Sequence, residues 1–245
     1  MKITIIAFGT RGDVQPLISL GKALQGRGHR VRLIASRNFA SWIEGHQLEA
    51  APAAVDIQAM MMGEGGLDWV EHGNDPIKQM RIIKDLINRH GLAMMRDAWP
   101  ACQDAQVIFS SFTSDVFAAS IAERLQAKQV STPLQPALVA TRSGLATQQA
   151  PLPNRHSLVN YLFGKWLVEP LGWRLMGEIN NQFRRETLGL PPQAIRDHRQ
   201  RMRSALVIQG FSRHVVPHPL DWPANIHTTG YWFLDEGHAW QPPRA

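Results

Sequence analysis

The first 35 residues constrain the fold most, because they predict a strand, a loop, a helix and a second strand in direct succession. Residues 2–8 form a nearly continuous apolar run rich in β-branched side chains, which is typical of a buried parallel strand. After a glycine-containing loop, Pro16 favours the start of a helix. The apolar face of that helix carries Leu17, Leu20, Gly21 and Leu24. Residues 31–35 complete a unit of the size of a βαβ crossover, which predicts a parallel sheet.

The rest of the chain continues this alternation of short apolar segments and amphipathic segments. Further strands are predicted at residues 48–51, 107–110, 129–131, 205–209 and 228–230. Helices are predicted at residues 38–45, 76–98, 115–126 and 157–188, the last interrupted near Pro170. Residues 60–75, which contain four glycines, are expected to form a loop. We therefore predict an α/β fold with a Rossmann-like open parallel β-sheet and helices on both faces.

Composition excludes several classes of protein. With 44% hydrophobic and 19% charged residues, the 245-residue chain can bury a sizeable core and is not expected to be disordered. The single cysteine, Cys102, excludes a disulfide framework and a cysteine-rich metal site. No apolar run is long enough to cross a membrane, and the first residues lack a signal-peptide cleavage pattern. A cytoplasmic location is therefore expected.

The net charge of +6 is concentrated in one stretch of the sequence. Nine basic and four acidic residues lie between Arg155 and Arg203. They form either a solvated helical face or a surface for an anionic membrane. Nucleic acid is not an expected partner, because no recognition motif accompanies the charge. Within this stretch, residues 158–176 carry several aromatic and aliphatic side chains, which suit either a helix packed on the core or a lipid-facing element.

The loop after the first strand is the segment with the most specific chemistry. Its glycines, Gly9 and Gly12, are spaced as Gly-x-x-Gly, which matches neither a dinucleotide-binding fingerprint nor a P-loop. A nicotinamide dehydrogenase or an NTPase is therefore disfavoured. Asp13 lies just before the predicted helix start at Pro16. Its carboxylate is expected either to cap that helix or to act as a general base at the mouth of a cleft.

The residues around this loop resemble a known family. Residues 8–16, Phe-Gly-Thr-Arg-Gly-Asp-Val-Gln-Pro, are similar to the N-terminal signature of the GT-B glycosyltransferases related to sterol glucosyltransferases. Antibiotic-tailoring glycosyltransferases and rhamnosyltransferases are close relatives. The likeness continues over nearly the whole chain, at residues 20–24, 27–33, 120–125, 132–136, 181–191, 216–223 and 229–233.

The resemblance implies an organisation and a function. Residues 1–237 would be a Rossmann-like acceptor-binding domain, the N-terminal half of a GT-B fold, and residues 238–245 the start of an interdomain linker. The C-terminal domain that binds the nucleotide sugar would be absent, so the fragment alone would be inactive and bind no cofactor. The full enzyme would move a hexose, with inversion, from a nucleoside-diphosphate sugar such as a UDP-sugar to a hydroxyl of a sterol, lipid or polyketide. The alternative is a non-catalytic lipid- or protein-binding module on the same fold.

The resemblance also implies roles for individual residues. Asp13 would be the catalytic base. Thr10, Arg11 and Gly12 would approach the donor phosphates, although Arg11 could instead pair with a carboxylate of its own domain. The acceptor would be bound by Ser110, Ser111, Thr113, Asp115 and Gln135. For Asp115 a helix cap is the alternative role. No metal site is expected, because the histidines lack ligand spacing and His29 is assigned to a structural turn.

Overall fold

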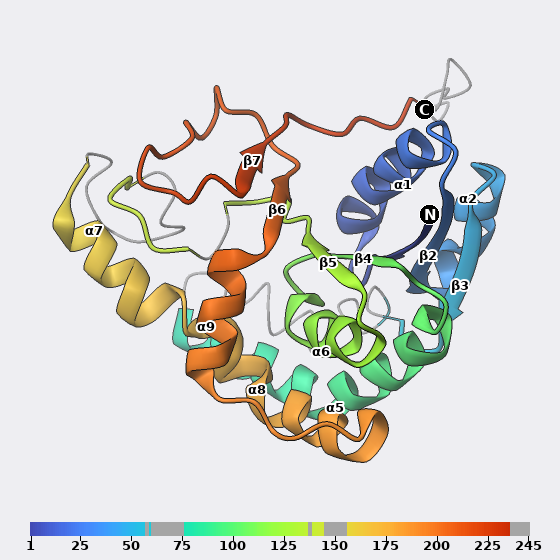
Figure 1. Ribbon diagram of the computed structural model, residues 1–245, viewed down its shortest axis with the longest axis horizontal. Coiled ribbons are helices and arrows are strands. Elements are labelled where there is room, and N and C mark those ends of the chain that lie inside the picture. The colour runs from blue at the N-terminus through green and yellow to red at the C-terminus, as the bar shows by residue number, and fades with distance from the viewer. Residues whose placement is uncertain (57–58, 60–75, 137–138, 145–155, 236–245) are drawn as a thin grey trace, which may run out of the picture.

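The computed structural model describes residues 1–56, 59, 76–136, 139–144 and 156–235 (Figure 1). The predicted loop at 60–75, the predicted linker at 238–245 and Arg155 lie outside the described residues.

The described chain forms one sheet of seven strands, and every pair of neighbours is parallel. The strands are β1 (Lys2–Ile6), β2 (Arg30–Ser36), β3 (Glu49–Ala53), β4 (Val107–Ser110), β5 (Lys128–Ser131), β6 (Leu206–Gln209) and β7 (Ile226–Thr228). Their order across the sheet is β3-β2-β1-β4-β5-β6-β7. The predicted Rossmann-like parallel sheet is confirmed. The last strand begins two residues earlier than expected, and the backbone N–H of Thr229 bonds the carbonyl of Gln209 at its end.

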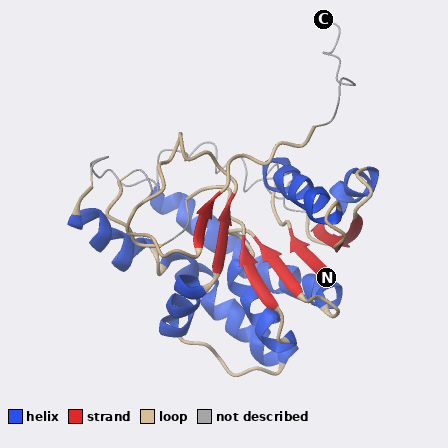
Figure 2. Cartoon of the chain, turned by 45° about the horizontal axis from the view of Figure 1, so that its top comes forward, coloured by secondary structure: helices blue, strands red, loops and turns tan. Residues whose placement is uncertain are grey.

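Helices cover both faces of the sheet, as predicted (Figure 2). They are α1 (Arg11–Gln25), α2 (Ala40–Gly45), α5 (Pro76–Cys102), α6 (Asp115–Leu125), α7 (Leu158–Phe163), α8 (Leu171–Phe183) and α9 (Ile195–Ser204). A short 3₁₀ helix, Arg37–Phe39, precedes α2. Two π-helical turns, Gly164–Val168 and Arg184–Leu188, follow α7 and α8. The expected break near Pro170 is confirmed, because Pro170 is the N-cap residue of α8.

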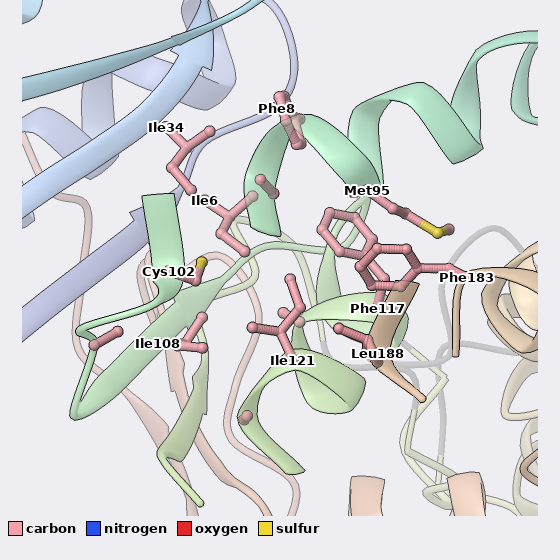
Figure 3. Close-up of a cluster of buried hydrophobic side chains, with 14 of the residues drawn as sticks. Ile6, Phe8, Ile34, Met95, Cys102, Ile108, Phe117, Ile121, Phe183 and Leu188 are labelled. Carbon is pink, nitrogen blue, oxygen red and sulfur yellow. The ribbon is translucent and has the colours of Figure 1, made fainter. Parts of the chain in front are cut away.

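Alternation along β1 builds the two layers of the core. Ile3 and Ile5 pack with α1 and α2 on one face of the sheet. Ile6 and the following Phe8 pack on the other face with α5, α6 and α8 (Figure 3). Because side chains alternate between faces in a strand, a segment buried on both sides must be apolar at nearly every position. The continuous apolar run at the N-terminus is therefore explained by the position of β1 in the middle of the sheet, where both of its faces are covered.

The strand order reverses its direction beside β1. The chain first adds β2 and β3 on one side of β1 and then adds β4 to β7 on the other. In open parallel sheets, the loops that leave the carboxyl ends of the strands at such a point diverge and leave a crevice for ligands. Here these loops are residues 7–10, after β1, and residues 111–114, after β4.

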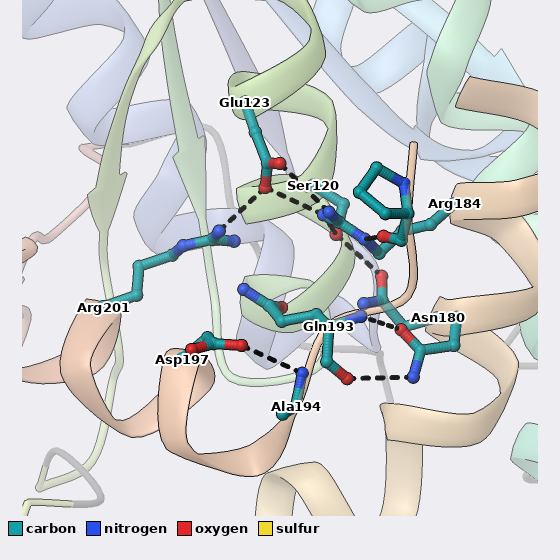
Figure 4. Close-up of polar contacts among 10 residues, drawn as sticks. Ser120, Glu123, Asn180, Arg184, Gln193, Ala194, Asp197 and Arg201 are labelled. Carbon is teal, nitrogen blue, oxygen red and sulfur yellow. Dashed lines mark hydrogen bonds and ion pairs between the residues drawn. The ribbon is translucent and has the colours of Figure 1, made fainter. Parts of the chain in front are cut away.

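The basic stretch between Arg155 and Arg203 is not one solvated face. Arg184 is only 3% exposed, and its guanidinium forms two hydrogen bonds with the carboxylate of Glu123, of 2.8 and 3.0 Å. It also donates to the hydroxyl of Ser120 and the carbonyl of Pro191 (Figure 4). Arg201 reaches the same Glu123 at 2.8 Å. These two arginines share the Glu123 carboxylate and join α6 to α9 and to the π-helical turn after α8, so they hold the domain together.

Glu123→Gln is expected to destabilise the fold. Hydrogen bonds from Arg184 hold the pKa of the Glu123 carboxyl below its usual range, so the carboxylate is the form that the fold favours. Its loss leaves a buried guanidinium without a counter-ion, which typically costs about 3–5 kcal/mol of unfolding free energy. Urea denaturation measures the difference.

Glu186→Gln is the matched control for this substitution. It breaks the pair of Glu186 with Arg96, whose side chains are 45% and 52% exposed, and is expected to cost about 0–1 kcal/mol. Equal effects of the two substitutions would contradict a structural role for the buried pair.

Candidate functional site

The loop after β1 holds Asp13 in a fixed position. The Oδ2 atom of Asp13 accepts hydrogen bonds from the Thr10 backbone N–H, at 2.8 Å, and from the Thr10 hydroxyl, at 3.1 Å. A Cβ atom on Gly9 would lie 2.2 Å from this Oδ2, so only glycine leaves room for the carboxylate. Oδ1 accepts no hydrogen bond from the described residues. Asp13 therefore caps α1 through Oδ2, as one of the two predictions stated. Its Oδ1 atom can still accept a hydrogen bond from a ligand.

The neighbours of Asp13 in this loop are exposed. Arg11 lies over the ring of Trp42, 5.0 Å from the centroid, and its Nε donates to Gln15 at 3.4 Å. A Cβ atom on Gly12 would meet only the Thr10 hydroxyl, at 3.8 Å, so a ligand can approach this backbone closely. The predicted role of Thr10, Arg11 and Gly12 toward donor phosphates stays a prediction.

The loop after β4 is tied directly to the loop after β1. The Thr113 hydroxyl donates to the carbonyl of Phe8 at 2.9 Å, and the Ser114 hydroxyl lies 3.4 Å from the carbonyl of Ile6. The hydroxyls of Ser111 and Thr113 lie 3.4 Å apart. Thr113 and Ser114 thus join the two loops at the carboxyl edge of the sheet, whereas Ser111 contacts Thr113 within its own loop. The predicted acceptor-binding roles of Ser111 and Thr113 stay predictions.

Asp115, the first residue of α6, is held by strand residues. Its Oδ1 accepts the hydroxyl of Ser110 and its Oδ2 the hydroxyl of Ser131, both at 2.6 Å. The side-chain amide of Gln129 donates to Ser110 Oγ at 2.9 Å, so the Ser110 proton is left to point at the carboxylate. Burial raises the pKa of Asp115 to about 7, although the two serine hydrogen bonds oppose the shift.

A cavity of about 70 Å³ opens beside Asp115. Helices α6 and α9 and strands β5 and β6 contribute most of its walls, and the loop after β5 adds Gln135. Its apolar lining includes Val116, Ala119, Met202 and Val207. The polar side chains at the cavity are Asp115, Gln129, Ser131, Gln135, His198 and Arg201. Such a cavity suits a largely apolar ligand that carries a few hydrogen-bonding groups.

The structure thus separates the predicted residues by position. Asp115 and Gln135 line the cavity and Ser110 orients Asp115, whereas Asp13 lies in the first turn of α1, after the neighbouring loop. His29 lies 3.4 Å from the N-terminal amine at the far end of α1.

Four polar residues of the cavity were not predicted from the sequence. Gln129 and Ser131 could have been, because they lie two positions apart in β5, on the same face, and Ser131 is at its carboxyl end. His198 and Arg201 reach the cavity only through the packing of α9, which no local pattern reveals.

A family model describes part of this arrangement. Residues 3–122 match the model of the glycosyltransferase family 28 N-terminal domain. Residues 3–122 form a glycosyltransferase family 28 N-terminal domain. The family 28 domain runs from β1 into α6 and includes Asp13 and Asp115. The cavity residues Gln135, His198 and Arg201 follow it in the sequence.

Curated relatives of this chain include two sterol 3-beta-glucosyltransferases. That of Yarrowia lipolytica is 33% identical over 237 residues, which cover 97% of this chain and 16% of the relative. That of Pichia angusta is 31% identical over 247 residues, which cover 100% of this chain and 19% of the relative. The chain, with its family 28 domain, thus spans less than a fifth of the length of the curated relatives it matches.

A solved structure supports the fold. The crystal structure of the glycotransferase of kitacinnamycin superposes with a TM-score of 0.58 at 15% sequence identity. The superposition covers 99% of this chain and 55% of that one. At this identity the likeness concerns the fold alone: the family 28 domain and the residues after it adopt the Rossmann-like arrangement of a glycosyltransferase half.

We predict that Asp115 makes the stability of the domain depend on pH. A pKa of about 7 in the folded chain, against about 3.9 when unfolded, means that the folded chain binds the proton more tightly. The contribution of Asp115 to the free energy of unfolding therefore falls as the pH rises from about 4 to about 7.

Asp115→Asn is expected to remove this dependence, because an amide does not titrate. Each unit of pKa difference is worth about 1.4 kcal/mol, so the variant should gain up to about 4 kcal/mol over the wild type at pH 8 and little at pH 4. Denaturation of both proteins across this range measures the difference. A constant difference between them at all pH values would contradict the raised pKa.

Proposed function

We propose that this chain is the acceptor-binding half of an inverting glycosyltransferase. In this proposal a hexose moves from a nucleoside-diphosphate sugar, such as a UDP-sugar, to a hydroxyl of an apolar acceptor such as a sterol, lipid or polyketide. The observation that carries the proposal is the placement of an apolar cavity and two carboxylates, Asp13 and Asp115, around the carboxyl ends of β1, β4 and β5. The family 28 match and the two sterol glucosyltransferase relatives support the reaction class.

The cavity supports an acceptor that is neutral and mostly apolar. Val116, Met202 and Val207 offer apolar surface, and Asp115 offers carboxylate lone pairs beyond those that the two serines use. A hydroxyl group of the acceptor can donate to such a carboxylate. Gln135, an exposed side chain at the same cavity, can exchange hydrogen bonds with the acceptor near the opening.

Asp13 is the proposed general base. Its Oδ1 takes the proton of the acceptor hydroxyl while the hydroxyl oxygen attacks the anomeric carbon of the sugar. The bond from that carbon to the diphosphate oxygen breaks, and the nucleoside diphosphate leaves with the bonding electrons, so the configuration inverts. The hydrogen bonds from Thr10 to Oδ2 keep the carboxylate in one orientation, which favours proton transfer at Oδ1.

The exposed start of α1 is the proposed contact for the donor. Backbone N–H groups at a helix N-terminus favour anions, and the Arg11 guanidinium adds a positive charge above Trp42. The sugar itself is proposed to be bound by a second half that faces this edge of the sheet. In the organisation proposed here, residues 1–237 form the acceptor domain and residues 238–245 lead toward that second half.

Asp13→Asn is expected to lower kcat about 10²–10⁴-fold with little change in KM for the acceptor, because a general base acts in the transition state. The measurement is sugar transfer to a panel of hydrophobic alcohols by a protein that carries this chain together with a nucleotide-sugar-binding half. Asp115→Asn, in contrast, is expected to raise KM for the acceptor.

Asp197→Asn provides a matched control for the helix cap. Asp197 accepts the backbone N–H of Ala194 at 3.2 Å and so caps α9 as Asp13 caps α1. Its substitution should cost a similar amount of stability and leave transfer unchanged. If the Asp13 and Asp197 variants keep equal activity, Asp13 has no part in the chemistry.

We also propose that α7 contacts an anionic membrane surface, where an apolar acceptor would be captured. Helix α7 lies at the periphery of the domain (Figure 1). Leu158, Val159, Leu162 and Trp166, which are each at least 44% exposed, fall on one side of α7 and of the turn after it. Lys165 lies 5.9 Å from the Trp166 ring and can meet lipid phosphates. None of the helices within the described residues is both long and apolar enough to cross a membrane.

Replacing Leu162 and Trp166 by serine should reduce sedimentation of the protein with vesicles of phosphatidylglycerol and phosphatidylcholine several-fold. Retention by the wild type should fade as salt screens the basic side chains. Leu220→Ser is the control, because Leu220 is fully exposed in the loop between β6 and β7. Unchanged retention of the double variant would contradict the role of α7.

A further inference from the structure

Two side chains of α9 at the cavity each carry a buried polar atom without a hydrogen-bond partner among the described residues. His198 and Arg201 lie three residues apart on α9 and both line the cavity. The buried atoms His198 Nε2 and Arg201 Nη1 have no hydrogen-bond partner among the described residues. An unsatisfied buried donor or acceptor typically costs about 1–3 kcal/mol, which a ligand atom can recover. We infer that these two side chains bind an oxygen atom of the ligand and so select oxygenated rings over plain hydrocarbons.

His198 is neutral in the folded domain. The side chain is only 6% exposed, and its ring stacks on Trp173 with 5.3 Å between centroids. Burial, followed by the charges of Arg201 and Arg199, lowers the pKa of His198 to about 4. A neutral imidazole can donate or accept one hydrogen bond at Nε2 according to its tautomer. It therefore suits an uncharged polar group.

Arg201 is anchored on one side and unpaired on the other. Its Nη2 donates to Glu123 at 2.8 Å, so the plane of the guanidinium is fixed (Figure 4). The opposite Nη1 is the buried donor without a partner. Since Glu123 is shared with Arg184, the local charge is positive and repels a cationic ligand. An oxygen with partial negative charge is the group that this donor binds.

Asp115, in the same cavity, disfavours a ligand with a negative charge. Burial raises the pKa of Asp115 to about 7, so above this pH an anionic ligand would meet the like charge of its carboxylate. The remaining class is a neutral ring system whose oxygen binds to Arg201 and His198, with apolar carbons against Val116, Met202 and Val207. This inference rests on the proposed function. It means that the acceptor carries an oxygen substituent on its ring that binds at α9, in addition to the hydroxyl that can reach a carboxylate.

The inference is tested with three probes that share one bicyclic skeleton: tetralin, 2-tetralone and 2-tetralol. Dissociation constants for the 245-residue chain are measured by NMR titration at pH 8, where Asp115 is mainly a carboxylate and gives no proton to a ketone. The ketone oxygen can accept hydrogen bonds but cannot donate them, so its binding reports on the hydrogen-bond donors of His198 and Arg201. The wild type is expected to bind 2-tetralone at least about tenfold more tightly than tetralin.

Two variants locate the effect. His198→Phe keeps the stack on Trp173 and removes Nε2, and Arg201→Lys keeps the charge next to Glu123 and removes the fork of donors. Each should reduce the preference for the ketone to less than about threefold. His46→Phe is the control, because His46 also contacts a tryptophan, Trp42, edge to face at 6.1 Å between centroids, away from the cavity.

The results separate this inference from the proposed function, because the titration needs no sugar transfer. Equal affinity of the wild type for 2-tetralone and tetralin would overturn the inference, as would binding of neither probe. A preference that survives in both α9 variants would overturn it as well. Each of these results would leave the Asp13 experiment untouched. Loss of the preference in the α9 variants, with His46→Phe unchanged, would support the inference even if Asp13 proved inactive.

Discussion

The parallel pairing of β1 with β2 on one side and β4 on the other is the constraint on which the site depends. It buries β1 on both faces and lays the carboxyl ends of β1 and β4 side by side. The loops that follow must then share one edge of the sheet. The hydrogen bond from Thr113 to the Phe8 carbonyl fixes the distance between them. Asp13 and Asp115, about a hundred residues apart in the sequence, each lie in the first turn of the helix that follows one of these two loops.

The two carboxylates occupy different environments. One oxygen of the Asp13 carboxylate accepts the hydrogen bonds from Thr10, and Asp13 lies half-buried in the first turn of α1. Asp115 is enclosed by Ser110, Ser131 and the apolar lining, and its pKa is raised for that reason. A half-buried residue at a helix start beside the sheet edge suits proton transfer to a reacting group, and a residue inside the cavity suits binding. The division of roles proposed here follows from these surroundings rather than from residue type.

Much of the fold was predictable because its signals are local. The β1 run and the alternation of elements each depend on neighbours in the sequence, and the seven-stranded parallel sheet follows from them. The predicted helix start at Pro16 was wrong, because α1 begins at Arg11, where Thr10 and Asp13 cap it, and Pro16 lies inside the helix. Parts of the site were predictable for the same reason, since Asp13 and Asp115 sit where loops meet helices. Arg184 was misread as a surface charge, because only the approach of α6 to α8 pairs it with Glu123. His198 escaped notice because its burial depends on Trp173 and the placement of α9.

The π-helical turn at Arg184–Leu188 adds a consequence for how such chains diverge. The hydrogen bonds of a π-helical turn span five residues instead of the four of an α-helical turn, so the turn holds one extra residue. Deleting one residue from this turn would rotate everything after it by about 100° relative to α8. The segment that leads to α9 would then leave in another direction, and α9 would no longer close the wall of the cavity. A difference of one residue at this turn would therefore reshape the cavity even where every side chain that lines it is retained.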